Sequence, residues 1–489
     1  MSEDYLGYFP DAELVIGLVH PIGTDYEPVL SAITDFLRQF EYDCNVVHLS
    51  SRFDEIADDL RITTELPPGG SEFERMKRKI GLGNAIRAKS KKDHVMALLA
   101  AAEIHGFRTT QGDATAPLPK TAHIIVSLKR PEEVECLRRI YGMGFYLVGV
   151  AANKRQREEY LKDRRGLAPE EIQKLTDIDA NESTDPQGQQ TRKTFYLSDV
   201  FVSLDNHSKE LQRFLDLCFQ SPEVTPTRDE YGMYLAYSAS LRSGDLARQV
   251  GAAITDQDGA VLALGCNDVP KFGGGLYWTE DIDKRRDIEL KYDANDREKA
   301  EMAVKIMRLI KPGTDDSVLL TAAKSTLEGT GFFDITEFGR SVHAEMDALL
   351  ACARTSRTTQ GATLYTTTFP CHNCTRHIIA AGVRRTVYIE PYAKSKAFQL
   401  HADAITDDTT IETKLPFVPF IGIGPRRYLD LFSLTLGTGT PRERKDGSGN
   451  LIAWEKRLAS PRLQMQPNSY LQRESFASGS LRDILEGNE

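Results

Sequence analysis

The feature that most constrains this chain is a pair of short segments, His343-Ala344-Glu345 and, twenty-five residues after Glu345, Pro370-Cys371-His372-Asn373-Cys374. Each segment opens an apolar stretch with helical spacing. One imidazole and two thiolates provide three zinc ligands and leave a fourth position for water, which is typical of a catalytic rather than a structural site. A cysteine at a helix N-terminus is also favoured as a thiolate by the helix dipole. The spacing therefore predicts one Zn²⁺ per chain, held by His343, Cys371 and Cys374.

Glu345 lies two residues from the predicted histidine ligand and need not bind the metal itself. A carboxylate at this position can carry a proton between activated water and a substrate nitrogen, so Glu345 is the predicted catalytic residue. The combination of His-x-Glu with Pro-Cys-x-x-Cys is the signature of zinc-dependent nucleobase deaminases. An isolated Cys-x-x-Cys also occurs in redox and structural zinc sites, but the His-x-Glu and the helix–strand–helix setting disfavour both. We interpret His372 and His377 as surface residues of the ligand helix.

Composition limits the other classes of protein. The 489 residues carry 61 Lys and Arg against 71 Asp and Glu, a formal charge of −10, which disfavours a protein that mainly coats duplex nucleic acid. No apolar stretch approaches the roughly 18 residues of a membrane span, so no membrane partner is expected. Seven cysteines are too few for a disulfide scaffold. We therefore expect a soluble enzyme in a reducing cytoplasm.

The first half of the sequence alternates strand and helix signals. Short apolar runs are followed by stretches in which apolar residues recur at helical spacing. The predicted strands are 14–19, 44–49, 122–128 and 145–150, and the predicted helices are 28–40, 91–104 and 131–141. Such alternation is typical of a parallel α/β sheet with helices on both faces. The polar stretch 176–192 has no periodicity, and we interpret it as a loop or as a segment that orders on binding.

The loop between the first strand and helix occupies the position of a phosphate-binding P-loop. It runs from Gly17 to Gly23 and continues into Thr24 and Asp25, so the usual lysine that contacts phosphate is missing. Asp25 would repel a phosphate unless a metal such as Mg²⁺ lay between them. We expect residues 1–220 to form a degenerate P-loop NTPase or nucleoside-monophosphate-kinase-like domain that acts as scaffold, nucleotide sensor or regulator. Its predicted nucleotide-binding residues are Gly17, Gly23 and Thr24.

A second unit is expected after two prolines near 221–227. The predicted C-terminal domain spans 225–430 and has the α/β/α layers of a zinc-dependent deaminase, with a hairpin over 252–265 and a charged insertion at about 280–338. The tail over 437–489 is rich in Gly, Ser, Arg and Pro, and is expected to be loosely ordered.

Residues 228–428 resemble the deoxycytidylate deaminase branch of the cytidine deaminase superfamily. The resemblance is carried by Arg248-Gln249-Val250-Gly251-Ala252, by Asn267 and Pro270, and by the zinc motif. The resemblance implies that Asn267, in the turn with Pro270, contacts the sugar. Tyr392 and Lys394 follow the last core strand, where the substrate loops of this fold gather, and Lys394 can meet a phosphate. The segment Thr366–Pro370 departs from the Glu-Pro often found before the first cysteine, so the phosphate state of the substrate is left open.

The order of the two parts, a P-loop-like domain followed by a deaminase domain, resembles the bacterial anti-phage dCTP deaminases. That resemblance implies conversion of deoxycytidine nucleotides to deoxyuridine nucleotides and ammonia, which depletes dCTP during infection. It also implies a homo-oligomer and an inhibitory small RNA, and dTTP is an expected regulatory nucleotide. Four alternatives stay open: a housekeeping dCMP deaminase, a single-stranded nucleic-acid cytosine deaminase, a kinase carrying a zinc domain, and a nucleotide sensor without chemistry.

Overall fold

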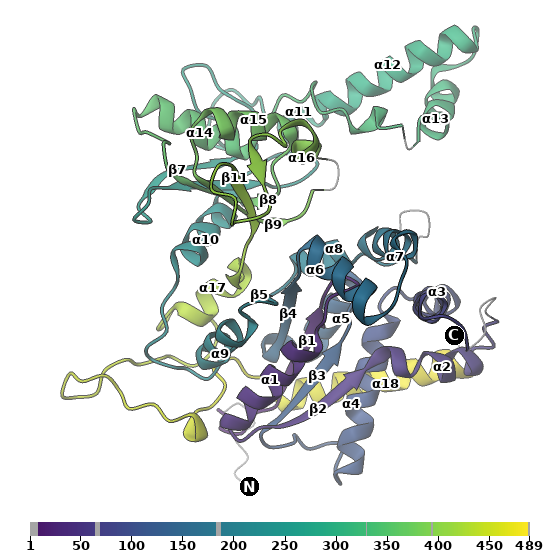
Figure 1. The fold of residues 1–489 in the computed structure, drawn as a ribbon, viewed down its shortest axis with the longest axis vertical. Coiled ribbons are helices and arrows are strands. Elements are labelled where there is room, and N and C mark those ends of the chain that lie inside the picture. The colour runs from purple at the N-terminus through teal and green to yellow at the C-terminus, as the bar shows by residue number, and fades with distance from the viewer. Residues whose placement is uncertain (1–7, 64–68, 182–186, 329, 393–394, 488–489) are drawn as a thin grey trace. The chain divides into compact units, whose positions relative to one another are not determined.

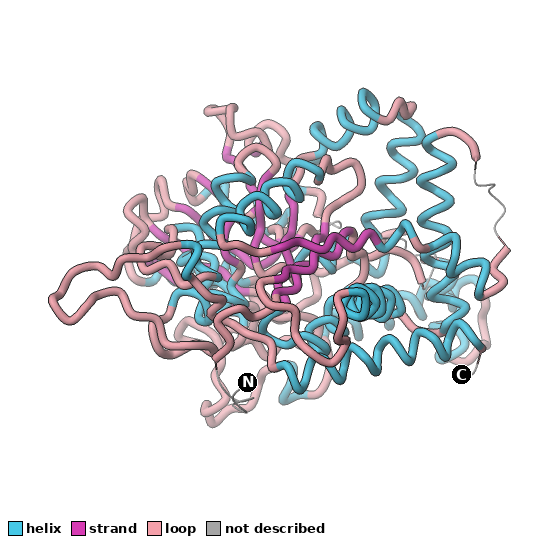
Figure 2. Tube along the Cα trace, turned by 90° about the horizontal axis from the view of Figure 1, so that it is seen from below, coloured by secondary structure: helices cyan, strands magenta, loops and turns pink. Residues whose placement is uncertain are grey.

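The computed structural model describes residues 8–487 apart from 64–68, 182–186, 329 and 393–394. The chain forms two compact units. The first unit combines Met1–Glu230 with Ile421–Glu489, and the second unit is Tyr231–Phe420. Both units are α/β, as predicted, and Figure 2 shows the helices in cyan and the strands in magenta. The expected boundary near 430 falls instead at Phe420, because the chain re-enters the first unit there.

The first unit contains a six-stranded sheet in the order β12-β5-β4-β1-β3-β2, parallel except for β12. Its strands are β1 (Leu14–Val19), β2 (Asp43–His48), β3 (Thr121–Val126), β4 (Phe145–Ala151), β5 (Val200–Ser203) and β12 (Gly422–Ile423). Its helices are α1 (Glu27–Gln39), α2 (Phe53–Asp59), α3 (Glu72–Ser90), α4 (Val95–Thr110), α5 (Pro131–Tyr141), α6 (Lys154–Glu159), α7 (Pro169–Asn181), α8 (Thr191–Tyr196), α9 (His207–Cys218), α17 (Pro425–Phe432) and α18 (Pro467–Glu486). The parallel sheet predicted from the strand and helix signals is confirmed.

Helices cover both faces of this sheet (Figure 1). Successive side chains of a strand point to opposite faces. Leu14, Ile16 and Leu18 of β1 therefore pack in the cluster that contains α1 and α9, whereas Val15 and Val19 pack with α4, α5 and α18. All six residues of β1 are buried, which explains why the sequence of this strand is a continuous apolar run.

The C-terminal segment belongs to the core of the first unit, so the loosely ordered tail expected over 437–489 was wrong. Tyr470, Leu471, Leu481 and Ile484 of α18 are buried in one cluster with α4, beside which α18 lies in yellow in Figure 1. The buried stripe also contains Glu474, a charged residue, which hid the helical spacing in the sequence.

The segment 176–192 also differs from the expected loop. α7 continues to Asn181 and α8 begins at Thr191, so the helical part is larger than the polar composition indicated. Residues 182–186 lie outside the described part of the chain. The extension of α7 matters because it carries Asp179, a buried acidic side chain.

The second unit has a six-stranded sheet in the order β10-β11-β9-β8-β6-β7, in which β6 runs antiparallel to both of its neighbours and the other pairs are parallel. Its strands are β6 (Gly251–Thr255), β7 (Val261–Cys266), β8 (Thr363–Thr368), β9 (Arg385–Glu390), β10 (Ile405–Thr406) and β11 (Leu415–Pro419). Its helices are α10 (Arg228–Ser240), which begins at the boundary, α11 (Asp287–Leu290), α12 (Ala294–Ile310), α13 (Asp316–Thr326), α14 (Ala344–Arg354), α15 (His372–Ala380) and α16 (Ala397–Leu400). None of the described helices of the chain is long and apolar enough to cross a membrane.

Two glycines set the helix layers on this sheet. A Cβ at Gly251 would lie 1.9 Å from the carbonyl oxygen of Ala236 in α10, and a Cβ at Gly265 would lie 2.2 Å from that of Ala344 in α14. Ala252 pairs with Gly265 across the hairpin, so the two glycines face opposite sides of the sheet. The glycines therefore let α10 and α14 approach opposite faces closely, and they fix where α14 begins.

The charged insertion predicted at about 280–338 contains α11, α12 and α13. Helices α12 and α13 pack on each other through a small apolar cluster of Ala303, Met307, Leu319 and Ala323. The segments that flank this helix pair carry polar residues that face the site described next.

Candidate functional site

The candidate metal ligands lie at the N-termini of two neighbouring helices. His343 is the N-cap residue of α14, and Cys371 is the N-cap residue of α15, which follows β8 directly. The Sγ atom of Cys371 accepts a hydrogen bond from the backbone N–H of Cys374 at 3.4 Å. This satisfies one of the unpaired N–H groups of the first helical turn and keeps negative charge at the positive end of the helix dipole.

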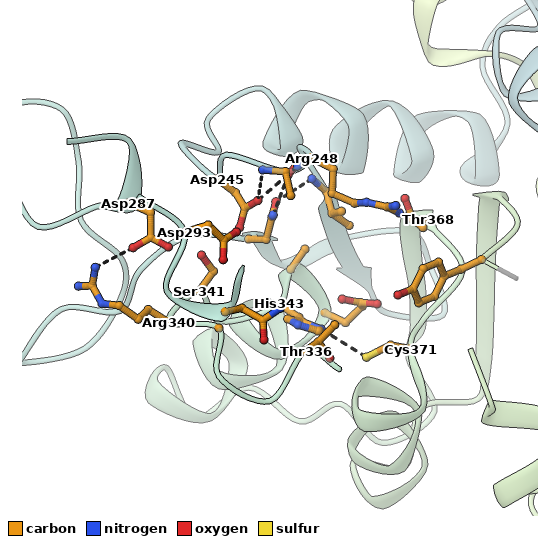
Figure 3. Close-up of a pocket in the computed structure, with 18 of the residues that line it drawn as sticks. Asp245, Arg248, Asp287, Asp293, Thr336, Arg340, Ser341, His343, Thr368 and Cys371 are labelled. Carbon is orange, nitrogen blue, oxygen red and sulfur yellow. Dashed lines mark hydrogen bonds and ion pairs between the residues drawn. The ribbon is translucent and has the colours of Figure 1, made fainter. Parts of the chain in front are cut away.

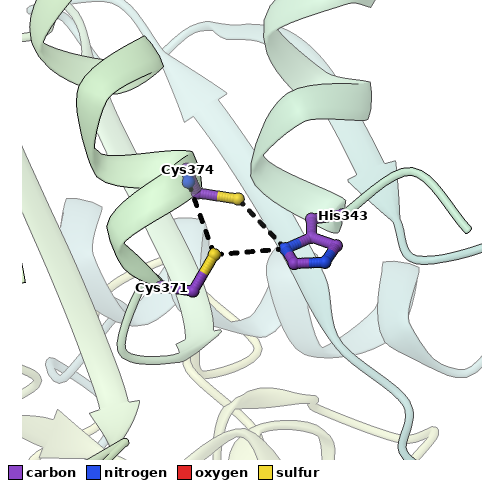
Figure 4. A group of neighbouring side chains, drawn as sticks. All are labelled: His343, Cys371 and Cys374. Carbon is purple, nitrogen blue, oxygen red and sulfur yellow. Dashed lines mark hydrogen bonds between the residues drawn. The ribbon is translucent and has the colours of Figure 1, made fainter. Parts of the chain in front are cut away.

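The three predicted ligands converge (Figure 4). The Nδ1 atom of His343 lies 3.3 Å from the Sγ atom of Cys371 and 3.3 Å from the Sγ atom of Cys374. All three donor atoms lie within 4.8 Å of one another. With Zn–N near 2.0 Å and Zn–S near 2.3 Å, tetrahedral ligand atoms lie roughly 3.5 Å apart. Both the donor types and their separations therefore fit zinc, and the predicted ligand set is brought together by the fold.

The three candidate ligands have pKa values that are shifted in different directions. The Cys374 thiol and the His343 imidazole donate toward Cys371 and lower the pKa of its thiol to about 4. The adjacent Cys371 sulfur raises the pKa of His343 to about 9. The pKa of Cys374 is raised, because this thiol donates to Cys371 and is buried. Metal binding needs neutral imidazole and thiolates, so a bound cation would displace the protons of His343 and Cys374.

Glu345 lies in the first turn of α14 and is only 4% exposed. Its Oε2 atom accepts a hydrogen bond from the Cys374 thiol at 3.4 Å. Burial, and after it the negative charge of Cys371, raises the pKa of the Glu345 carboxyl. A carboxyl group whose pKa is shifted toward neutrality can both accept and return a proton, which is what the sequence predicted for this residue.

A cavity of 210 Å³ adjoins the metal ligands (Figure 3). Its walls come from the segments that precede β6 and follow β7, from α11 and the start of α12, from the segment that leads into α14, and from residues that follow β8 and β9. They are formed by Asp245, Ala247, Arg248, Val250, Asn267, Asp287, Asp293, Asn295, Thr336, Gly339, Arg340, Ser341, His343, Ala344, Glu345, Thr368, Phe369, Cys371 and Tyr392. The cavity thus joins the metal ligands and Glu345 to a polar surface that carries both signs of charge.

Of the four predicted substrate residues, Asn267 and Tyr392 line this cavity. The Asn267 side chain accepts the backbone N–H of Val250 at 2.7 Å and donates to the carbonyl oxygen of residue 248 at 2.8 Å, so it holds the loop over the cavity. Pro270 is exposed, in a bridge to Leu276, and is not part of the cavity wall. Lys394 lies outside the described residues.

Several wall residues were not predicted as site residues. Arg248 was noted only within the resembling segment, yet its guanidinium lies 5.4 Å from the ring centroid of Tyr392 and faces the cavity. Arg340 pairs with Asp287 at 2.7 Å, and both come from the flanks of the insertion. No spacing pattern in the sequence could have identified Arg340 and Asp287 as site residues, because the insertion contacts the core only through tertiary packing. Thr368, in the segment that departs from Glu-Pro, donates from Oγ1 to Glu390 at 3.1 Å.

The loop of the first unit matches the phosphate-binding prediction only in part. Gly17 lies inside β1, and a Cβ there would lie 2.7 Å from Cδ1 of Leu128, so packing rather than phosphate contact explains this glycine. Gly23 has a φ of +82°, and a Cβ there would lie 2.8 Å from the carbonyl oxygen of Arg157. Thr24 is 4% exposed. The loop is therefore tightly packed in this structure.

Comparison with known proteins agrees with the geometry of the second unit. Residues 226–390 match the family model described as the cytidine and deoxycytidylate deaminase zinc-binding region. The chain is 42% identical over 55 residues to the deoxycytidylate deaminase of enterobacteria phage T4, a match that covers 11% of this chain and 28% of that protein. It is 26% identical over 188 residues to the probable deoxycytidylate deaminase of Drosophila melanogaster, covering 38% and 70% of the two chains.

Among solved structures, the dCMP deaminase of cyanophage S-TIM5 in complex with dCMP and dUMP is similar at 19% identity and a TM-score of 0.24, covering 40% of this chain and 99% of that chain. The chain spans 29% of the length of the deoxycytidylate deaminase of phage T2 and 28% of that of phage T4. Residues 226–390 are therefore similar to the zinc-binding region of cytidine and deoxycytidylate deaminases.

Proposed function

We propose that the second unit catalyses the zinc-dependent hydrolytic deamination of the cytosine base of a deoxycytidine nucleotide. The observation that carries this proposal is the convergence of His343, Cys371 and Cys374 beside the buried carboxyl of Glu345 in one cavity. Three nitrogen and sulfur ligands with an open fourth position are the donor set of a catalytic zinc.

Zinc held by these ligands would supply a Lewis acid that lowers the pKa of a water molecule toward about 7. Glu345 accepts the proton of the water that attacks C4 of the base. The same carboxyl then delivers this proton to ring N3. It next takes the proton of the new C4 hydroxyl and passes it to the amino group, which leaves as ammonia while the C4 carbonyl forms. Burial raises the pKa of the Glu345 carboxyl, which favours its uptake of the proton from water.

The nucleoside and its phosphate would lie against the polar wall of the cavity. Asn267 fixes the loop that begins after Arg248, and we assign the sugar contact to this loop. Arg248 is a cation at the cavity and a partner for a phosphate oxygen. The printed names of the relatives, deoxycytidylate deaminases of phages and of Drosophila, support a deoxycytidine nucleotide as substrate.

The finer proposal is that dCTP, dCMP or both are consumed and that the resulting loss of dCTP limits phage replication. It is supported by the order of a P-loop-like part before a deaminase part, noted in the sequence. The same resemblance supports a homo-oligomer, a regulatory nucleotide such as dTTP, and inhibition by a small RNA.

The test measures ammonia release by the zinc-loaded full chain from dCMP, dCTP and a cytosine-containing single-stranded DNA, with and without dTTP. Glu345→Gln serves as the inactive control. Turnover of a free nucleotide that disappears in this variant supports the proposal, and dCMP turnover without dCTP turnover would restrict it to a housekeeping role. Turnover of the DNA alone, or phosphate transfer from ATP without ammonia release, would contradict it.

A further inference from the structure

The loop after β1 contacts an anion that the chain itself provides. The Asp179 carboxylate accepts hydrogen bonds from the backbone N–H of Ile22 at 2.8 Å, from the Lys129 ammonium at 2.7 Å and from the Thr191 hydroxyl at 3.1 Å. The Asp179 side chain is 3% exposed, and that of Lys129 is 13% exposed. A backbone amide, an ammonium and a hydroxyl are the donors that commonly bind a phosphate oxygen.

Lys129 supplies the cation that the sequence of the loop lacks. It follows β3, the parallel neighbour of β1, and its Nζ also donates to the carbonyl oxygen of His20 in the loop, at 2.8 Å. The donors therefore meet at the carboxyl ends of two adjacent parallel strands. Ligands of open α/β sheets bind outside this edge.

Two buried donors of this region have no hydrogen-bond partner among the described residues: the Thr24 hydroxyl, in the loop, and the Nε of Arg157, an electrostatic neighbour of Asp179. Thr24 is 4% exposed and lies two residues after Ile22, and the carbonyl oxygen of Arg157 faces Gly23. Buried polar groups are nearly always paired, so both donors are available to an oxygen atom of a ligand or of water. A carboxylate has two oxygens, whereas a phosphate group offers three.

The charges of this region also favour an anion. Asp179, Arg192 and Glu158 are the electrostatic neighbours of Arg157, and Lys129 contacts Asp179 directly. Without Asp179, the described charged neighbours of Arg157 would be Arg192 and Glu158, with Lys129 left without its carboxylate partner. Helix α7, which carries Asp179, packs mainly through the small cluster of Leu161, Leu167, Ile172 and Leu175 with Ile22 rather than through the large cores of the first unit. Segments with few buried apolar contacts open locally at the smallest free-energy cost.

We propose that the first unit contains a site for a phosphate group of a nucleotide or polyphosphate, formed by Ile22, Thr24, Lys129, Arg157 and Thr191, and that Asp179 closes it as an internal competing ligand. Binding requires Asp179 to withdraw, so the ligand and α7 compete for the same donors. The site is separate from the cavity of the second unit, and the inference does not depend on deamination.

The experiment measures binding of inorganic phosphate, tripolyphosphate and ATP, each alone, to the full chain by titration calorimetry. Asp179→Ala removes the internal ligand, and Asp177→Ala, an exposed position on the same helix, is the matched control. We expect Asp179→Ala to bind at least one of the three compounds roughly tenfold or more tighter than the wild type and the control. The compound that gains affinity identifies the source of the phosphate group.

Adding Lys129→Met to Asp179→Ala should abolish the gain. Equal affinities in wild type, control and Asp179→Ala, or a gain that persists without Lys129, would overturn the proposal. If Asp179→Ala does not fold, hydrogen exchange of the wild type decides: saturating ATP or tripolyphosphate should speed exchange of the α7 amides, and unchanged or slower exchange with both contradicts the competition.

Discussion

Arg108 on α4 and Glu474 on α18 form a buried, bidentate ion pair although 366 positions separate them in the sequence. The Nε atom of Arg108 lies 3.2 Å from Oε1 of Glu474, and its Nη2 atom lies 3.3 Å from Oε2. Both side chains are almost fully excluded from solvent, and Arg108 also donates to Glu13 at 2.7 Å. The pair therefore fixes the last helix of the chain to the interior of the first unit.

Glu474→Gln should strongly destabilise the first unit. The substitution leaves the Arg108 guanidinium buried with less compensating charge, and removing one partner of such a pair costs about 3–5 kcal/mol. The chain has two tryptophans, Trp278 in the second unit and Trp454 in the first. Urea unfolding followed by Trp454 fluorescence in a Trp278→Phe background measures the loss. Asp483→Asn, at an exposed position of α18, should change the unfolding free energy little, and an equal effect of the two substitutions would contradict the buried pair.

Truncation after Gln466 should prevent the first unit from folding. The deletion removes Tyr470, Leu471, Leu481 and Ile484 from the core. Each fully buried large apolar side chain contributes about 1.5–3 kcal/mol, so their sum is comparable with a whole domain stability of about 5–15 kcal/mol. Limited proteolysis should degrade residues 8–220 in the truncated protein while leaving the second unit protected. Equal protease resistance of the first unit with and without α18 would show that the helix is dispensable.

Glu345→Gln should keep zinc and lose catalysis. The amide preserves the size of the side chain but cannot accept a proton, and proton transfer by such a group contributes about 10²–10⁴-fold to rate. Zinc content is measured by atomic emission and turnover by ammonia release from dCMP and dCTP. Loss of zinc in this variant would mean that the carboxyl is a ligand rather than a proton carrier.

Cys371→Ser and His343→Ala should each lose zinc and lower the stability of the second unit, because metal binding is coupled to folding. The fluorescence of Trp278 in a Trp454→Phe background follows this unit. Chelation of the wild-type protein should reproduce the change, and Cys136→Ser, a thiol in the first unit, should not. A second unit equally stable with and without the metal would contradict a ligand role for these side chains.

Stability of the first unit should fall as the pH drops below about 6.5. Burial, and after it the charge of Lys129, lowers the pKa of His20 to about 3. The contact with Pro21 and the charge of Asp179 raise this pKa by less than the first two effects lower it. The other ring nitrogen of His20 lies 3.1 Å from the Ser127 hydroxyl. The unfolded chain takes up a proton at its ordinary pKa and the folded chain does not. The unfolding free energy therefore decreases by about 1.4 kcal/mol per pH unit between about 6.5 and 3.

Denaturant unfolding at pH 7 and pH 5 measures this dependence through Trp454. His20→Asn should make the pH dependence shallower, by about 2 kcal/mol over the interval. Substitution of the exposed His48 is the control, and a pH dependence unchanged by His20→Asn would refute the assignment.

The grouping of the three candidate metal ligands could be predicted because the information for it is local. His343 and Cys371 each begin a helix, and their spacing to Glu345 and Cys374 is fixed within one helical turn. The strands of the parallel sheet could also be predicted from local sequence, because a strand that is buried on both faces is a continuous run of apolar residues, as in β1.

The remainder depended on contacts that no local pattern records. Arg340 and Asp287 reach the cavity from an insertion whose packing on the core is not encoded in periodicity. The buried face of α18 contains the charged Glu474, whose partner Arg108 is far away in the sequence. This face therefore lacks the uniformly apolar spacing from which a buried helix is predicted. Asp179 lay in a stretch interpreted as a loop, and its role follows only from its contact with Ile22 and Lys129.

The return of the chain to the first sheet has a consequence for protein synthesis. β12 and α18 are made after the whole of 231–420, yet they complete the sheet and the core begun by β1 and α4. On the ribosome, the second unit can reach its native state while the first still lacks an edge strand and a covering helix. The apolar surface of α4 stays uncovered until α18 emerges, so we expect the first unit to depend more on chaperones than the second.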